Sequence, residues 1–310
     1  MEDRDTEPQP QWRPALFRPP TEGEQPRPPQ RATLHEGLTY AAIPGYRPLL
    51  MDVYVPEESS KAPCVMWMHG GAWLLGDRRL PPALWPQGEL FQKLVDAGFA
   101  VATIDYRHAR EAPFPAQLHD AKAAIRYLRE FASTLHLDPD RIAVWGESAG
   151  AQLAMLTALS ADRPESEGTI GVTGPRSSVA AVIDWYGRAD AADPDEGAPL
   201  SMPEDDGRGG PPPRMPMDVL LAGSPLGEAA VIEASPHARV HSGAPPFFVM
   251  HGEDDRLIPI AQSEVLVDRL AAAGVEVTFR RVPGADHVFM GVDPLPLMDE
   301  TITWLRGVLS

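Results

Sequence analysis

The sequence has little that would suit a disulfide-linked, membrane-spanning or nucleic-acid-binding protein. It contains one cysteine, Cys64, so no disulfide can form within the chain. None of its apolar runs reaches the roughly 20 residues that a membrane-spanning helix requires. Basic residues are scarce too, since 27 lysines and arginines stand against 44 aspartates and glutamates and leave a net charge of −17. This acidic balance argues against nucleic acid and anionic membrane surfaces as partners.

The first residues also lack the apolar core of a secretory signal, which predicts a cytoplasmic location. The length of 310 residues suits one large domain. Residues 1–32 are rich in Pro, Glu, Gln and Arg, and we expect them to form a disordered extension. Residues 33–310 are expected to fold, with an irregular insertion at about 188–217 that is either a lid over a cleft or a loop without a binding role.

Beyond the extension, apolar runs of strand length alternate with segments of helical periodicity. Expected strands lie at 33–40, 49–55, 63–68, 99–104, 142–145, 179–186, 246–250 and 275–282. Expected helices lie at 89–97, 118–135, 149–159 and 260–273, and a last one carries Met298 to Leu309. The first two strands should pair antiparallel around a turn at 44–46. The alternation predicts an α/β fold with a mostly parallel sheet and helices on both faces.

The pentapeptide GESAG at 146–150 is the most informative motif in the chain. It lies between an apolar run at 142–145 and a helix-compatible stretch at 149–159. A serine between glycines at a sharp strand-to-helix turn exposes its hydroxyl, and the glycines leave room for adjoining strands. The pattern predicts that Ser148 is a nucleophile. The alternative is a glycine-lined turn in which Ser148 caps the helix.

A second glycine motif, HGGAW at 69–73, follows directly after the apolar run at 63–68. Acyl transfer through a tetrahedral intermediate places negative charge on the former carbonyl oxygen, and backbone N–H groups are its usual stabilisers. Glycines let the backbone approach a substrate closely. We therefore expect the N–H groups of Gly71, Ala72 and Ala149 to form an oxyanion hole.

An acid is expected after the buried run at 246–250, which continues into HGEDDRLIP at 251–259. An acid at the carboxyl end of a parallel strand faces the same cleft as the nucleophile. Three acids compete for this place. Asp255 is preferred because it lies in the loop beyond the strand end, whereas Glu253 and Asp254 are expected to face solvent.

The histidine follows from the order of such a triad, which runs serine, acid, histidine. Of the nine histidines, only His287 follows Asp255 in the sequence. A helix at 260–273 and a strand at 275–282 fill the interval between the two, as a βαβ unit requires. The sequence thus predicts a catalytic triad of Ser148, Asp255 and His287.

With these motifs in place, the chain from about residue 35 to the C-terminus resembles the α/β-hydrolase esterases. The nearest group is the bacterial hormone-sensitive-lipase-like and feruloyl- or acetyl-esterase-like enzymes. The resemblance also rests on DYR at 105–107, DWYG at 184–187 and Ser-Pro at 235–236. One departure is Ala72, where many hormone-sensitive-lipase-like members carry a third glycine. The resemblance implies a serine carboxylesterase for small short- to medium-chain esters, with no metal and no organic cofactor.

Two other functions stay open. The α/β-hydrolase fold also hosts amide hydrolases, and an arylformamidase-like enzyme acting on amides or formamides shares the same motifs. A non-catalytic ligand-binding protein on a hydrolase scaffold belongs to a different class, although such proteins usually lose a triad member. All three functions imply a small-molecule partner, and the sequence leaves the oligomeric state open.

Four side chains near the expected cleft allow further predictions. Trp73 and Trp185 are candidates for lining the acyl pocket, although a tryptophan beside a cleft is as often part of the core. Asp105 and Arg107 follow a strand, and their opposite charges suggest a strand-end ion pair rather than a catalytic role.

Overall fold

The computed structural model describes residues 28–161, 163–193 and 216–310. The extension expected at 1–32 lies almost entirely outside the described residues, as does most of the insertion expected at 188–217. The expected domain boundaries therefore stay predictions.

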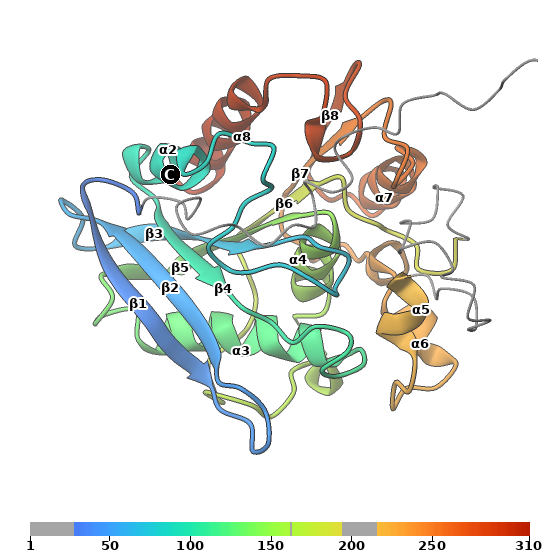
Figure 1. Cartoon of the computed structure of the whole chain (residues 1–310), viewed down its shortest axis with the longest axis horizontal. Coiled ribbons are helices and arrows are strands. Elements are labelled where there is room, and N and C mark those ends of the chain that lie inside the picture. The colour runs from blue at the N-terminus through green and yellow to red at the C-terminus, as the bar shows by residue number, and fades with distance from the viewer. Residues whose placement is uncertain (1–27, 162, 194–215) are drawn as a thin grey trace, which may run out of the picture.

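One sheet of eight strands forms the centre of the described part of the chain (Figure 1). The strands are β1 (Ala32–Ala41), β2 (Leu49–Pro56), β3 (Ala62–Met68), β4 (Ala100–Ile104), β5 (Leu137–Glu147), β6 (Ala181–Trp185), β7 (Phe247–Gly252) and β8 (Val277–Val282). Their order in the sheet is β1-β2-β4-β3-β5-β6-β7-β8. β2 pairs antiparallel with both β1 and β4, and the other neighbours are parallel. The mostly parallel sheet and the antiparallel first pair are both confirmed.

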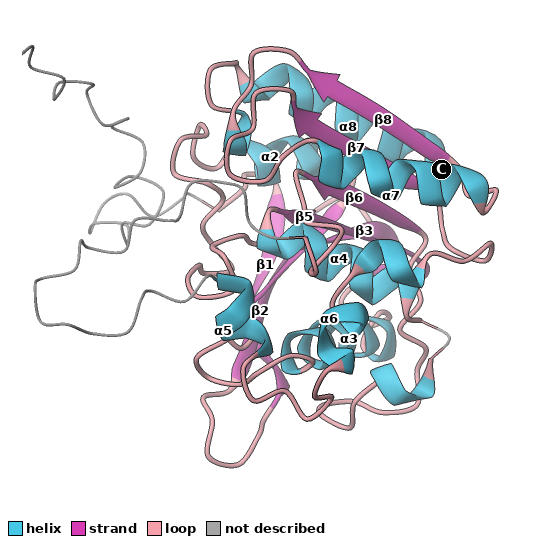
Figure 2. Cartoon of the chain, turned by 90° about the vertical axis from the view of Figure 1, so that its right-hand side faces the viewer, coloured by secondary structure: helices cyan, strands magenta, loops and turns pink. Residues whose placement is uncertain are grey.

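Helices cover both faces of this sheet (Figures 1 and 2). The α-helices are α2 (Glu89–Asp96), α3 (Ala116–Glu130), α4 (Ala149–Leu159), α5 (Pro216–Leu221), α6 (Ala229–Glu233), α7 (Ala261–Ala272) and α8 (Pro294–Val308). Three short 3-10 helices are η1 (Pro164–Ser166), η2 (Pro236–Arg239) and η3 (His287–Phe289). Apolar side chains of α2 and α8 pack into one core, and those of α3, α4 and α7 pack into the other.

Strand β3 shows how one apolar run serves both cores. Successive side chains of a strand point to opposite faces of the sheet. Cys64 and Met66 accordingly pack with α3 and α4, whereas Val65 and Trp67 pack with α2 and α8. Because helices cover both faces of β3, its side chains are apolar on both faces, and the apolar run is continuous rather than alternating.

Two helical regions differ from the sequence-based expectation. The predicted apolar face extends to Leu135, but α3 ends at Glu130. Leu135 lies in the turn that follows α3, and its side chain is buried. His136 then takes a φ of 53°, which no α-helix contains, and leads the chain into β5. Helices α5 and α6 were not predicted, because segments of six and five residues are too short to show a helical period.

Candidate active site

Ser148 lies in the sharp turn between β5 and α4. Its φ of 52° and ψ of −118° fall outside the conformations that L-residues usually adopt. A Cβ atom on Gly146 would lie 2.1 Å from the carbonyl oxygen of Gly150, and one on Gly150 would lie 2.1 Å from that of Met68. The two glycines are therefore what allows α4 to begin so close to the sheet, with the Ser148 side chain held at the turn.

Two loops bring an imidazole and a carboxylate to Ser148. His287 follows β8, and its Nε2 atom lies 3.0 Å from the hydroxyl oxygen of Ser148. Asp255 follows β7, and its Oδ2 atom lies 2.7 Å from Nδ1 of His287. All three residues are buried, with exposed fractions of 8% or less. The structure thus joins the three predicted residues into one hydrogen-bonded chain from carboxylate to hydroxyl.

Asp255 is the acid that reaches this chain, while Glu253 and Asp254 are exposed. Its Oδ1 atom accepts the backbone N–H groups of the residues two and three positions further on, at 2.9 and 2.8 Å. Burial alone would raise the pKa of Asp255. The charge of His287 and hydrogen bonds from His251 and His287 more than offset it and hold that pKa well below its usual range. The carboxylate is therefore ionised at neutral pH.

The protonation of His287 follows from its two contacts. Its Nδ1 faces a carboxylate and carries the proton, so Nε2 presents a lone pair to the hydroxyl of Ser148. Burial lowers the pKa of His287, but the charges of Asp255, Glu147 and Asp286 raise it above its ordinary value. The imidazole is thus a stronger base than a free histidine side chain.

The loop that carries Gly71 and Ala72 directly follows β3, which neighbours β5 in the sheet. Gly71 has a φ of 109°, and a Cβ atom there would lie 2.4 Å from the carbonyl oxygen of Leu75. Among the described residues, the N–H groups of Gly71 and Ala72 donate to no other backbone carbonyl. Ala149 begins α4, so its N–H also has no partner within the helix. Their role as an oxyanion hole stays a prediction.

Glu147 connects the two glycine motifs, a role that the sequence analysis missed. Its carboxylate accepts the backbone N–H of Gly70, where a Cβ atom would lie 2.2 Å from Oε1 of Glu147. Burial raises the pKa of Glu147 to about 7, although His287 and the Gly70 N–H act in the opposite direction. Glu147 occupies the second position of GESAG, which the G-x-S-x-G motif leaves unspecified, so the motif alone gave no sign of this contact.

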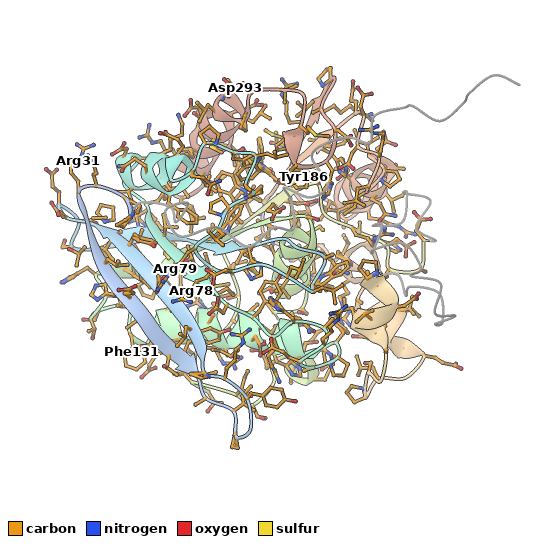
Figure 3. The ribbon with its side chains drawn as sticks, in the orientation of Figure 1. Arg31, Arg78, Arg79, Phe131, Tyr186 and Asp293 are labelled. Atoms are coloured by element: carbon orange, nitrogen blue, oxygen red, sulfur yellow. The ribbon has the colours of Figure 1, made fainter. Side chains whose placement is uncertain are left out.

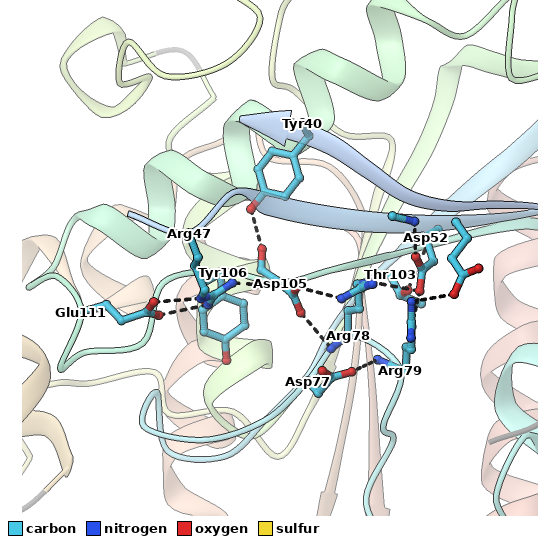
Figure 4. A network of polar contacts seen from close by, with 12 residues as sticks. Tyr40, Arg47, Asp52, Asp77, Arg78, Arg79, Thr103, Asp105, Tyr106 and Glu111 are labelled. Carbon is cyan, nitrogen blue, oxygen red and sulfur yellow. Dashed lines mark hydrogen bonds and ion pairs between the residues drawn. The ribbon is translucent and has the colours of Figure 1, made fainter. Parts of the chain in front are cut away.

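An ionic network around Arg78 holds the segment that follows the glycine motif at 69–73 (Figures 3 and 4). The guanidinium of Arg78 lies 3.1 Å from Oδ2 of Asp52 on β2 and 2.9 Å from Oδ2 of Asp105 after β4. Asp105 therefore pairs with Arg78 and not with Arg107. The predicted ion pair between Asp105 and Arg107 is wrong, because α3 brings Asp120 to within 2.6 Å of the Arg107 guanidinium.

The two tryptophans predicted to line a pocket are both buried. Trp185 has no exposed surface, and its ring centre lies 4.8 Å from that of Trp145 and 4.9 Å from that of Phe289. Its side chain points into the core under α2 and α8, so the prediction that it lines the pocket is wrong. Trp73 is 5% exposed and packs with the opposite core, and its role in a pocket stays a prediction.

Three further features of the described residues bear on the chemistry. No three His, Cys, Asp or Glu side chains in this part of the chain are grouped closely enough to hold a metal ion. Cys64 is buried within β3 as a free thiol. Of the helices in residues 28–161, 163–193 and 216–310, none has the length and apolar character needed to cross a membrane.

The sheet order and the positions of serine, acid and histidine after β5, β7 and β8 define the α/β-hydrolase class. The family model BD-FAE matches residues 51–270, which is well over half of the chain. The chain therefore belongs to the BD-FAE family of α/β-hydrolase esterases.

Curated relatives of this chain are named as esterases. The chain is 33% identical over 250 residues to Esterase LipQ of Mycobacterium tuberculosis, covering 79% of this chain and 55% of that protein. It is 30% identical over 272 residues to Carboxylesterase NlhH of the same species, covering 84% of this chain and 75% of that protein. The chain thus spans about half the length of LipQ and three quarters of NlhH.

Solved structures agree with this assignment. A truncated form of a carbohydrate esterase from gut microbiota superposes with a TM-score of 0.75 at 26% identity, covering 92% of this chain and 99% of that one. A bifunctional GH43-CE protein of Bacteroides eggerthii gives a TM-score of 0.72 at 27% identity, covering 89% of this chain and 38% of that one.

Proposed function

We propose that this protein is a serine carboxylesterase that hydrolyses small esters of short to medium acyl chains through an acyl-enzyme. The observation that carries the proposal is the buried hydrogen-bonded chain from Asp255 through His287 to Ser148. Membership of an esterase family supports the bond type.

The acylation step uses the geometry described above. The hydroxyl oxygen of Ser148 attacks the ester carbonyl carbon while its proton moves to Nε2 of His287. Asp255 keeps the Nδ1 proton of His287 in place and stabilises the imidazolium that forms. The tetrahedral intermediate then collapses, the bond to the alcohol oxygen breaks, and the leaving alcohol takes the proton from Nε2.

Deacylation repeats these steps with water as the nucleophile. His287 takes a proton from the water as it attacks the acyl carbon, and returns it to the oxygen of Ser148 as the acid leaves. In both halves the former carbonyl oxygen carries negative charge. We assign its stabilisation to the N–H groups of Gly71, Ala72 and Ala149, each typically worth about 3 to 4 kcal/mol.

Covalent labelling by a fluorophosphonate probe, with Ser148→Ala as control, tests the mechanism. The folded protein should be labelled at Ser148 and should hydrolyse p-nitrophenyl acetate, and the variant should do neither. A folded protein that is neither labelled nor active would instead indicate a ligand-binding protein on a hydrolase scaffold.

A substrate panel tests the proposed range. p-Nitrophenyl esters of increasing chain length should lose kcat/KM steeply beyond about octanoyl, because longer chains clash with a pocket sized for short to medium acyl groups. Acetylated carbohydrates belong in the panel because one structural neighbour is a carbohydrate esterase. N-formylkynurenine is the decisive competitor, since a clear preference for it would make the protein a formamide hydrolase.

A cytoplasmic location stays a prediction from the sequence.

A further inference from the structure

A second imidazole contacts the acid of the proposed triad. His251 lies in β7 and has no exposed surface. Its Nε2 atom lies 3.2 Å from Oδ2 of Asp255 and 2.8 Å from the carbonyl oxygen of Ile258. Its Nδ1 atom lies 2.7 Å from the hydroxyl oxygen of Ser263 on α7. Both ring nitrogens are therefore engaged, and none of these three contacts involves Ser148.

The contacts of Nε2 decide which ring nitrogen carries the proton. A carbonyl oxygen and an ionised carboxylate can only accept, so Nε2 of His251 must be the donor to both. Oδ2 of Asp255 consequently accepts from two imidazoles, His251 on one side and His287 on the other. The backbone N–H of Ile258 donates to Oδ1 of the same carboxylate, and the carbonyl oxygen of Ile258 accepts from Nε2 of His251. Ile258 therefore contacts both Asp255 and His251.

We propose that His251 is a positioning residue that holds the carboxylate of Asp255 in the orientation that His287 needs for proton transfer. The proposal rests on the proposed esterase function. Without the His251 donor, Oδ2 of Asp255 keeps only His287 as a side-chain partner. The two backbone donors still hold Oδ1, but the position of Oδ2 is less restrained. His287 then spends less time aligned with Ser148. The loss falls on the chemical step, because His251 acts through Asp255 and His287, which take part in proton transfer.

The test compares His251→Phe with His251→Gln. Phenylalanine supplies an aromatic ring without a donor, whereas the amide nitrogen of glutamine is as many bonds from the backbone as Nε2 of histidine. The active fraction of each preparation is first counted by complete reaction with a fluorophosphonate, and kcat is then expressed per reactive site. His119→Phe on α3 is the matched control, because within the described residues its Nε2 has no hydrogen-bond partner.

We expect His251→Phe to lower kcat per reactive site by about tenfold to a hundredfold, as the loss of a hydrogen bond to a charged group implies. KM should change by less than about twofold, because substrate binding is untouched. His251→Gln should recover most of the lost kcat, and His119→Phe should match the natural protein. A merely structural role would lower the active fraction and leave kcat per site unchanged in all variants, which would overturn the proposal.

A second variant covers the case in which His251→Phe does not fold. Ser263→Ala keeps His251 and removes only the partner of its Nδ1, so kcat per site should fall by a smaller factor of about two to ten. A folded Ser263→Ala protein with unchanged kcat would then count against the positioning role. Failure of the natural protein to react with either ester or fluorophosphonate would overturn the proposed function, and this inference with it. An active natural protein with a fully active His251→Phe variant would overturn the inference alone.

Discussion

The indole Nε1 of Trp85 donates a hydrogen bond to the carbonyl oxygen of Val288, 2.9 Å away and 203 positions further along the chain. Val288 directly follows His287, and it has a φ of 58°. A β-branched residue rarely adopts this conformation, so the surrounding structure must hold it there. The bond from Trp85 is one such restraint on the turn that carries the proposed catalytic base.

Replacing this donor should loosen the turn. Trp85→Phe leaves the carbonyl oxygen of Val288 without its partner in a buried site, and we expect the free energy of unfolding to fall by about 1 to 3 kcal/mol. kcat should fall more than KM rises, because the position of His287 is affected rather than the binding of substrate. Urea unfolding and ester kinetics measure both quantities. Trp304→Phe on α8 is the control, and equal effects of the two substitutions would contradict the prediction.

The contact between Gly70 and Glu147 predicts a strong effect of one methyl group. Gly70→Ala would place a Cβ atom 2.2 Å from Oε1 of Glu147, so the carboxylate or the loop at 69–73 must shift. We expect kcat to fall at least about tenfold and stability to fall by about 1 to 3 kcal/mol. Gly307→Ala in α8 is the matched control. A Cβ atom there meets no atom within 4 Å, so it should raise stability by about 0.5 to 1 kcal/mol. Full activity of Gly70→Ala would show that the contact is not needed.

The raised pKa of Glu147 predicts that the stability of the protein depends on pH. Its pKa is raised from 4.5 to about 7, so between these values the folded protein keeps a proton that the unfolded chain has lost. The free energy of unfolding of the natural protein should therefore fall as pH rises through this window, by about 3 kcal/mol relative to Glu147→Gln. Glutamine keeps an acceptor for the Gly70 N–H and does not titrate. Urea unfolding at pH 4.5 and 8 measures the difference, and parallel pH curves for the two proteins would contradict it.

The buried and exposed ion pairs should respond differently to the same substitution. Arg107→Met leaves the fully buried Asp120 carboxylate without its cation, and we expect a loss of about 3 to 5 kcal/mol in the free energy of unfolding. Arg176→Met breaks an equally short contact with Asp140, but both side chains are mostly exposed. Its effect should stay below about 1 kcal/mol. Chemical denaturation of the two variants in one buffer decides between them, and similar losses would refute the distinction.

The sequence predicted the residues of the site because each lies in a short pattern with a local physical cause. Ser148 needs small neighbours in a strained turn, and Asp255 and His287 need places just after strands of a parallel sheet. The structure brings all three within hydrogen-bonding distance. The alternation of strands and helices predicted the sheet for the same reason, since period and length are local properties.

The errors concern contacts between segments that are far apart in the sequence. Trp185 lies at the end of β6, but only the pairing of the strands shows that its side chain faces the core beneath α8. Asp105 and Arg107 are close in sequence, yet the chain brings Arg78 to the first and Asp120 to the second. His251 was missed because its i, i+4 spacing to Asp255 has no meaning until the loop between them folds back.

The order in which the site residues appear along the chain has a consequence for synthesis on the ribosome. The serine in the turn after β5 is synthesised 139 residues before the imidazole after β8. A growing chain therefore carries the hydroxyl without its base while these residues are added, and an acyl donor encountered then would find no activated nucleophile. Reactivity should begin only when the last strand and helix have joined the sheet.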